Sequence, residues 1–247
     1  MFIVPRTARL AAPNHPHHIT HRGVDRQPVF HDDQDYRDYL LFLGELTRRT
    51  ATGVWAYCLM PNHVHLILTP STAEGLSRSV AETARRFART SNRRRSRQGP
   101  LWQSRFYSVA LDELHFLEAA RYVLLNPVRA RLASRVELWP WSSFRAHQAG
   151  ADDLVDTAPL AQRIGTVDAF VAVGLQRDVS DRIRAATRTG RPLGNKTFSD
   201  TIARAHGVTL PARGRGRPSQ RDRPGHESNS SAARPDCGRH LNPCAYN

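Results

Sequence analysis

Two β-rich segments of this chain are separated by only two residues, and that spacing limits how the chain can fold. The segments span 54–60 and 63–69, and Pro61 and Asn62 stand between them. Proline and asparagine are favoured in tight turns, and a two-residue connection is typical of a β-hairpin. We therefore expect the two segments to form neighbouring antiparallel strands.

Apolar periodicity on either side of this hairpin predicts further elements. They are strands at 17–24 and 101–111 and helices at 32–49 and 74–95. Another helix, over 113–125, is expected to stop at Asn126 and Pro127, because the residue before a proline disfavours helical backbone. The order β-α-β-β-α-β followed by a helix is typical of an α+β, ferredoxin-like split βαβ fold. Helices would cover one face of the antiparallel sheet and leave the other face free to hold a site.

Signals for regular structure weaken after about residue 145. Short helices are expected within 150–190, and another near 197–206. From Pro211 onward the chain is rich in Arg, Gly, Pro, Ser and Asn, a composition typical of disorder. The expected division is a main domain over 1–147, a helical extension over 148–210 and a basic disordered tail over 211–247.

The charge of the chain favours a polyanionic partner. It holds 36 Lys and Arg against 22 Asp and Glu, a formal charge of +14, and Lys196 is its one lysine. Codon bias of a GC-rich genome explains the preference for arginine over lysine, but not the excess of basic over acidic residues. No apolar run approaches the roughly 18 residues of a membrane helix, and the start does not resemble a signal peptide. We expect a soluble cytoplasmic protein with no membrane partner.

His63 and His65 lie two residues apart in a predicted strand, so both imidazoles should project from one face of the sheet. Val64 and Leu66 should then point to the opposite face. Two imidazoles on one rigid surface can share a divalent metal ion, and by ligand type they suit zinc as well as Mn²⁺. The alternative is that they are ordinary surface or core histidines.

Tyr122 is a candidate nucleophile in the helix expected at 113–125. It points away from the apolar stripe of that helix, and it shares a polar ridge with Glu118 and Asn126 at a spacing of four residues. A tyrosine in that position is either a surface residue or a nucleophile whose phenolate attacks phosphorus. The side-chain carbonyl of Asn126, one turn further on, can reach the same metal ion.

Several stretches resemble the REP-associated tyrosine transposases, a branch of the single-tyrosine HUH transposases (His, bulky apolar residue, His). The resemblance covers roughly residues 16–218. It is carried by HHITHRGVDRQPVFHDDQD (17–35), YCLMPNHVHLILTP (57–70), GPLWQSRFYSVALD (99–112), RYVLLNPVRARL (121–132), WPWSSFRAH (139–147), GRPLG (190–194) and GRGRP (214–218). The resemblance implies the same ferredoxin-like fold, of the HUH nuclease type.

The resemblance also implies a chemistry and a substrate. His63 and His65 would hold Mg²⁺ or Mn²⁺, and Tyr122 would be the nucleophile. Asn126 stands where related enzymes often have a glutamine ligand, one methylene longer. The implied reaction is metal-dependent transesterification, through a 5′-phosphotyrosine, that cleaves and rejoins single-stranded hairpin DNA of the REP type. The enzyme would act as a monomer or a homodimer.

A run of basic residues between Glu82 and Asp112, followed by aromatic residues, predicts where DNA lies. The alternative is a solvated helix end. The candidate DNA-binding residues are Arg85, Arg86, Arg89, Arg93, Arg94, Arg95, Arg97, Trp102 and Arg105.

Other interpretations stay open at this point. Tyr107 is the second candidate nucleophile, whereas Tyr36 and Tyr39 belong to a helix expected to pack elsewhere. A domesticated relative that binds repeat DNA without cutting it is the alternative function. A water-using metal hydrolase is a third, although no carboxylate set accompanies the histidines. The hairpin that is read, and the base that accepts the proton of Tyr122, are not identified.

Overall fold

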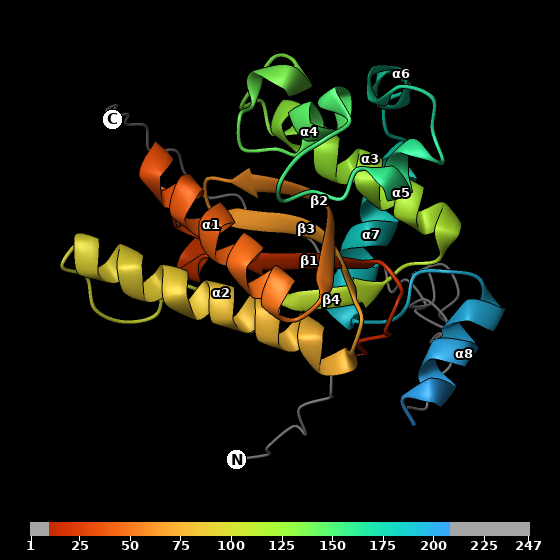
Figure 1. The fold of residues 1–247 in the computed structure, drawn as a ribbon, viewed down its shortest axis with the longest axis horizontal. Helices are drawn as coiled ribbons and strands as arrows, with labels where there is room; N and C mark the ends of the chain where they lie inside the picture. Colours follow the sequence, from red (N-terminus) through yellow and green to blue (C-terminus); the bar gives the residue numbers. More distant parts are fainter. Residues whose placement is uncertain (1–9, 208–247) are drawn as a thin grey trace, which may run out of the picture. The chain divides into compact units, whose positions relative to one another are not determined.

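The computed structural model describes residues 10–207, and it contains the predicted antiparallel sheet of four strands. The strand order is β2-β3-β1-β4, the order of a ferredoxin-like fold, so the expected α+β class is confirmed (Figure 1). The strands are β1 (His17–Arg22), β2 (Thr52–Met60), β3 (His63–Pro70) and β4 (Tyr107–Ala110). Across the described residues, no helix is both long and apolar enough to span a membrane.

Helices connect and follow the strands. They are α1 (Asp33–Arg49), α2 (Ala73–Arg94), α3 (Glu113–Arg129), α4 (Phe144–Ala149), α5 (Ala158–Ala161), α6 (Val167–Ala172), α7 (Arg177–Thr189) and α8 (Lys196–Ala205), with 3-10 turns η1 (Val24–Arg26) and η2 (Val136–Leu138). Four of the longer helices, α1, α2, α3 and α8, begin at capping side chains that accept a backbone N–H three residues on. These caps are Asp32, Thr72, Asp112 and Asn195.

One face of the sheet is closed by α1 and α2. Ile19, Val64 and Leu66 point to this side and are fully buried among the apolar residues of the two helices. Tyr36 and Tyr39 of α1 belong to the same cluster, as expected for tyrosines that pack away from a site. Burial of this kind is the main stabilising contribution to such a domain.

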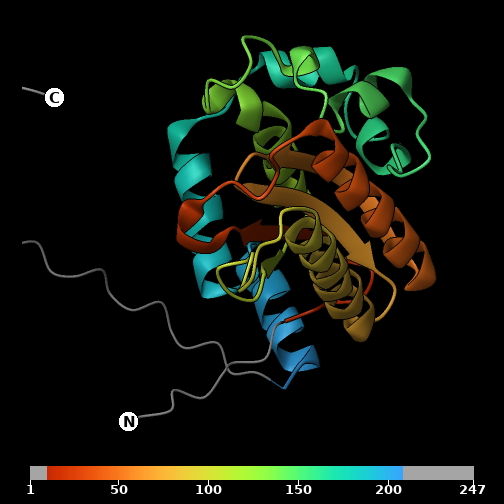
Figure 2. The same cartoon turned by 90° about the vertical axis from the view of Figure 1, so that its left-hand side faces the viewer.

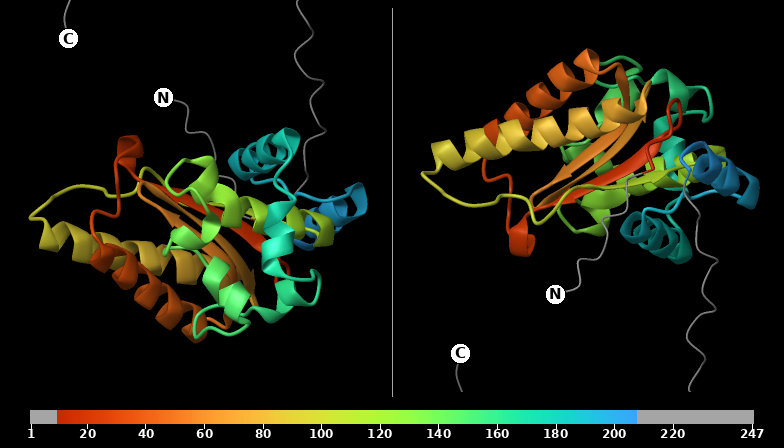
Figure 3. Two further views of the ribbon diagram at one scale, coloured as in Figure 1. Left: turned by 90° about the horizontal axis from the view of Figure 1, so that it is seen from above. Right: turned by 90° about the horizontal axis from the view of Figure 1, so that it is seen from below.

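The opposite face is also covered, which corrects the expectation of a free face. Helix α3 packs on β2 and β3, and α7 packs on β1 and β4, so the sheet lies between two helical layers (Figure 3). The contact between Trp55 of β2 and Phe116 of α3, with ring centroids 5.1 Å apart, belongs to this second core. Helices from the C-terminal third of the chain supply the rest of the cover, and local periodicity carries no sign of such distant packing.

Two predicted boundaries were wrong. The predicted strand 101–111 is reduced to β4, because the segment before it forms a loop that is joined to the end of β1 at an isolated bridge between Trp102 and Gly23. Helix α3 continues through Pro127 to Arg129. Proline in the last turn forfeits only its own N–H, and the next N–H groups still bond back, Ala130 to Asn126 and Arg131 to Val128.

The segment after α7 is tied to the start of α3. Leu193 forms backbone hydrogen bonds with Ala110 and Asp112. The Asp112 carboxylate accepts the N–H of His115 through one oxygen and the N–H of Asn195 through the other, each at 3.0 Å. The short helices expected within 150–190 and near 197–206 are present as α5 to α8, and α7 runs alongside the sheet (Figure 2). The predicted tail over 211–247 lies outside the described residues, and the division at 147 and 210 stays a prediction.

Candidate active site

The two histidines of β3 form the centre of the candidate site. His63 and His65 project from the sheet face that α3 covers, and their ring centroids are 4.8 Å apart. Val64, between them, points into the opposite core, as strand alternation predicts. The rigid strand therefore presents two imidazoles side by side.

Each of these rings has a partner at Nδ1. His63 Nδ1 lies 2.6 Å from Asn62 Oδ1 in the turn between β2 and β3. His65 Nδ1 lies 2.9 Å from Nε2 of His18, a fully buried residue of β1 whose ring stacks on that of His65. Nε2 of both β3 histidines is thus the ring nitrogen that remains for a ligand.

Burial keeps these histidines neutral at pH 7. It lowers the pKa of His63 to about 4, with a smaller contribution from the positive charge of Arg22. It lowers the pKa of His18 to about 3 and that of His65 well below its usual range. A neutral imidazole has a lone pair, the form that a metal ion requires.

Tyr122 lies against the histidines. It is only 4 % exposed, and its ring centroid is 5.4 Å from that of His65 and 5.9 Å from that of His18, edge-on in both cases. The surface-tyrosine interpretation is therefore wrong. Tyr122 does point away from the stripe identified in the sequence, but that side of α3 is covered too, and Glu118 on the same ridge pairs with Arg182 of α7.

Asn126 and Arg129 follow Tyr122 along the same side of α3. The Arg129 guanidinium lies 4.8 Å from the centre of the Tyr122 ring, and its charge contributes to the low pKa of His65. Asn126 lies one turn after Tyr122 and three residues before Arg129, on the same side of the helix. Asn126 is buried, and within residues 10–207 its amide nitrogen has no hydrogen-bond partner.

These side chains fit a divalent cation. The donors are two neutral imidazoles side by side on one strand, and the side-chain oxygen of Asn126 is a third candidate ligand. Among the described residues, no three His, Cys, Asp or Glu side chains are grouped as a metal site. A set with few protein ligands is typical of catalytic metal centres, where substrate oxygens and water complete the coordination.

Tyr107, the second candidate nucleophile, lies on the same face of the sheet. It pairs with Thr20 of β1, which in turn pairs with His65 of β3. Tyr107 is therefore two strands away from His65, and it is 47 % exposed. Tyr122, which touches the His65 ring, is the better placed of the two.

The predicted DNA-binding arginines fall into two groups. Some tie α2 to α1: Arg86 to Glu45 at 2.6 Å, Arg94 to Asp38 at 2.5 Å, and Arg95 to the buried Asp35 at 2.5 Å. Arg85 pairs with Glu82 one turn back on α2. Others lie on the surface, where phosphate can reach them. Those exposed or half-exposed residues are Arg89, Arg93, Arg97 and Arg105.

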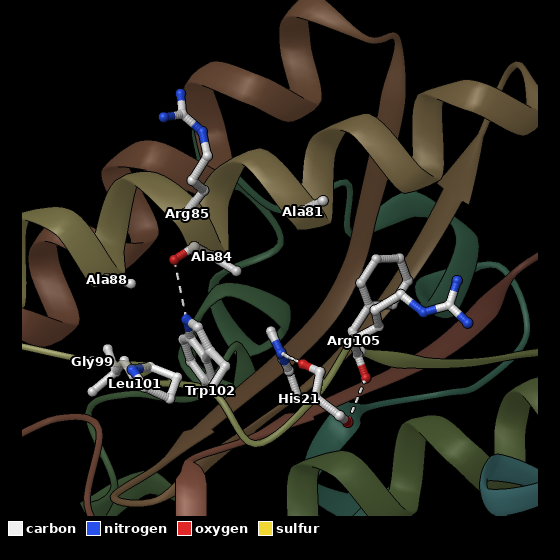
Figure 4. Close-up of a pocket in the computed structure, with 12 residues that line it drawn as sticks. His21, Ala81, Ala84, Arg85, Ala88, Gly99, Leu101, Trp102 and Arg105 are labelled. Atoms are coloured by element: carbon white, nitrogen blue, oxygen red, sulfur yellow. Dashed lines mark hydrogen bonds between the residues drawn. The ribbon is translucent and has the colours of Figure 1, made fainter. Parts of the chain in front are cut away.

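Trp102 forms one wall of a hollow of about 350 Å³ between α2 and the loop before β4 (Figure 4). Its indole N–H donates to the Ala84 carbonyl at 3.0 Å, and its ring stacks on His21 with centroids 4.2 Å apart. His21 and Arg22 are consecutive in β1 and so point to opposite faces. The hollow and the histidine site thus lie on the two sides of the same strand end.

Sequence reasoning missed His18, Arg22 and Arg129. The even-numbered residues of the predicted strand 17–24 share a face, and His18 and Arg22 are among them, but only the pairing of β1 with β3 brings them to His65 and His63. Arg129 was hidden by the expected helix end at Pro127. It lies seven residues after Tyr122, a spacing that places both on one face once the helix continues.

Parts of the chain are similar to known transposases. Residues 11–125 match the family model described as "Transposase IS200 like". The fold is similar to a REP-associated tyrosine transposase bound to a REP hairpin, with 18 % identity, a TM-score of 0.47, and coverage of 60 % of this chain and 86 % of that one. It is also similar to a putative transposase from Deinococcus radiodurans R1, with 19 % identity, a TM-score of 0.34, and coverage of 48 % and 95 %.

No curated protein matches the chain. The matched segment 11–125 contains both β3 histidines and Tyr122, so the family match and the site described above involve the same residues. This segment of the chain is similar to the IS200-like transposases.

Proposed function

We propose that this chain is a transposase that cleaves and rejoins single-stranded hairpin DNA, of the REP type, through a covalent bond between Tyr122 and a 5′ phosphate. The observation that carries the proposal is the contact between the Tyr122 ring and the His65 ring, 5.4 Å between centroids, on the face that also presents His63. The hairpin substrate follows from the motifs that resemble REP-associated transposases.

In the proposed reaction, the Tyr122 oxygen attacks the scissile phosphorus. A bond forms between that oxygen and phosphorus, and the bond from phosphorus to the 3′ oxygen breaks. The phenol loses a proton and the departing 3′ oxygen gains one. The phosphotyrosine ester conserves the energy of the broken bond, so a second 3′-OH can reverse the step and join a new strand.

His63, His65 and Asn126 would hold a divalent metal ion, Mg²⁺ or Mn²⁺. When bound, the ion would supply a Lewis acid to a non-bridging phosphate oxygen. Arg22 and Arg129 support the same step from the protein side, because their positive charges flank the histidines and balance the charge of a phosphate.

The path of the DNA follows from the exposed arginines and the hollow. A strand that reaches the histidines at the end of β1 passes Arg22 and the loop that carries Arg105, and Gln103 in that loop bonds to the Arg22 carbonyl. Arg105 can contact phosphate there, and the accessible edge of the Trp102 ring can contact unpaired bases. Arg86, Arg94 and Arg95, held in ion pairs with α1, contribute less to this path.

The test is a search for a covalent adduct on labelled REP-like hairpin DNA from the source genome, with Mg²⁺ or Mn²⁺. The wild type and Tyr107→Phe should form a 5′-linked adduct that withstands denaturing electrophoresis. Tyr122→Phe should form none, although it should still retard the hairpin in a native gel. EDTA should abolish the adduct.

Three outcomes would contradict the proposal. An adduct with Tyr122→Phe would show that another residue is the nucleophile. Loss of the adduct in Tyr107→Phe would then identify that residue as Tyr107. Retardation without product under either metal would identify a DNA-binding relative that no longer cuts. A free 5′-phosphate product formed independently of Tyr122 would indicate hydrolysis by water.

A further inference from the structure

Two hydrogen-bond chains enter the site from different parts of the fold, and each ends on one of the β3 histidines. The first starts at the Arg26 carbonyl and passes through Asn62 to His63. The second starts at the Ile183 carbonyl in α7 and passes through Thr187 and His18 to His65. Since hydrogen bonds have direction, each chain restricts where the histidine protons lie.

The first chain is ordered by the amide of Asn62. Its nitrogen donates to the Arg26 carbonyl at 2.9 Å, which turns its oxygen toward His63. That oxygen only accepts, so the proton between Asn62 and His63 belongs to His63 Nδ1. A neutral His63 carries one ring proton, and its Nε2 therefore bears the lone pair.

The second chain is ordered by the hydroxyl of Thr187. That group donates its single proton to the Ile183 carbonyl at 2.7 Å, so it accepts from His18 Nδ1, at 3.3 Å. His18 then carries its proton on Nδ1, and its Nε2 accepts from His65 Nδ1, at 2.9 Å. His65 is left with a lone pair on Nε2, the same arrangement as in His63.

We infer that Asn62 and the pair His18–Thr187 are positioning residues that hold His63 and His65 in the same tautomer, with the proton on Nδ1 and Nε2 free to bind a metal ion. The inference rests on the proposed metal role for the function, but the proton arrangement is a property of the protein alone. Partners beyond the metal ligands orient such rings and raise their affinity for the ion.

Loss of the Thr187 hydroxyl has a defined consequence. Without its acceptor, His18 can place its proton on Nε2 and donate to His65 Nδ1. His65 then carries its proton on Nε2, which blocks the nitrogen that faces the site. A residue of α7, 122 positions after His65 in the sequence, thereby controls a ligand on β3.

The first experiment reads the tautomers directly, by long-range ¹H–¹⁵N correlation NMR of the full chain at pH 7 without metal. In the wild type, His18, His63 and His65 should all show the Nδ1–H form, which is the less populated form of histidine in water. Thr187→Val should shift His65 toward Nε2–H and leave His63 unchanged. Asn62→Ala should do the reverse.

The second experiment measures Mn²⁺ affinity in the same variants by calorimetry. Thr187→Val should weaken binding by about 10- to 100-fold, the range for lost outer-shell partners. Thr187→Ser keeps the hydroxyl and should restore wild-type affinity. Thr189→Val is the matched control, because the Thr189 hydroxyl, on the same helix, bonds to the carbonyls of Ala185 and Ala186.

Two results would overturn the inference: a wild-type His65 that carries its proton on Nε2, or a Thr187→Val variant that matches Thr189→Val in both measurements. A failure of the proposed function looks different. If the tautomers are as stated but no hairpin adduct forms with Mn²⁺, the proton arrangement holds and the cleavage proposal does not.

Discussion

The two faces of the sheet are built from the same strands and serve different ends. On the side of α1 and α2, Ile19, Val64 and Leu66 are fully buried among apolar neighbours. On the side of α3 and α7, His65 contacts His18, His63 and Tyr122. Strand alternation places stability on one face and polar chemistry on the other, one residue apart.

The sharpest test of this comparison substitutes neighbours on opposite faces. Leu66→Ala should lower the free energy of unfolding by about 2–5 kcal/mol, because it leaves a cavity in the closed core. At temperatures where the Leu66→Ala variant is still folded, it should form the DNA adduct as the wild type does. Chemical unfolding and the adduct assay measure the two properties.

His63→Ala should show the opposite pattern. His63 is half-buried, so its loss should change the free energy of unfolding by less than about 1 kcal/mol, while the adduct is lost. If Leu66→Ala abolished cleavage in the folded state, or if His63→Ala unfolded the chain, the division between the faces would not hold.

Acid should weaken the protein through the histidine face. The pKa of His18 is about 3 in the folded chain, because of burial, and 6.5 ordinarily, so between those values the unfolded chain binds an extra proton. His18 alone should lower the free energy of unfolding by about 1.4 kcal/mol for each pH unit between 6.5 and about 3, and His63 and His65, whose pKa values burial also lowers, add to this slope. The stabilising contribution of the neutral histidines is fully present only above pH 6.5.

Urea unfolding at pH 7, 6 and 5 measures this slope, and His18→Gln should reduce it by the contribution of one proton. Asp112 does not interfere in that range. Burial raises the pKa of its carboxyl, but hydrogen bonds from His115 and Asn195 outweigh burial and hold the pKa below its usual value. An unchanged slope in His18→Gln would show that His18 is not the group that titrates.

The arginines allow a comparison of the same kind within α2 and its following loop. Arg95→Ala should lower the free energy of unfolding by about 2 kcal/mol, because it removes a charged hydrogen bond to the buried Asp35. Arg105→Ala should leave stability unchanged, weaken hairpin binding, and reduce the salt dependence of binding by about one ion. Binding titrations at several salt concentrations separate the two; a large loss of stability in Arg105→Ala would contradict the assignment.

The smallest expected effect concerns the start of α3. Asp112→Ala removes the helix cap and the bond to Asn195, and it should lower the free energy of unfolding by about 1 kcal/mol. Asp32→Ala, which removes the corresponding cap of α1 on the other face, is the comparison. Of the two, only Asp112→Ala should also slow adduct formation, since Tyr122 lies on α3.

The order of strands and helices, and the shared face of His63 and His65, are predictable because they depend on local periodicity. What could not be predicted depends on residues far apart in the chain. Glu118 looks like part of an exposed ridge until Arg182 of α7 covers it. Arg95 looks like part of a basic run until Asp35 of α1 neutralises it.

The end of α3 shows a different kind of error. Helices usually end before a proline, so we expected this helix to end at Asn126. Arg129, three residues further on, was therefore not considered. The missing N–H of Pro127 costs little in a last turn whose remaining groups bond to one another. An average preference therefore concealed a cation that lies over the Tyr122 ring.

The carboxylate of Asp112 caps the start of α3, the helix that carries Tyr122, and also accepts the backbone N–H of Asn195. One side chain thus connects the helix of the candidate nucleophile to the segment that precedes α8. A movement of the start of α3 would therefore either carry the segment around Asn195 with it or first break the hydrogen bond between Asp112 and Asn195.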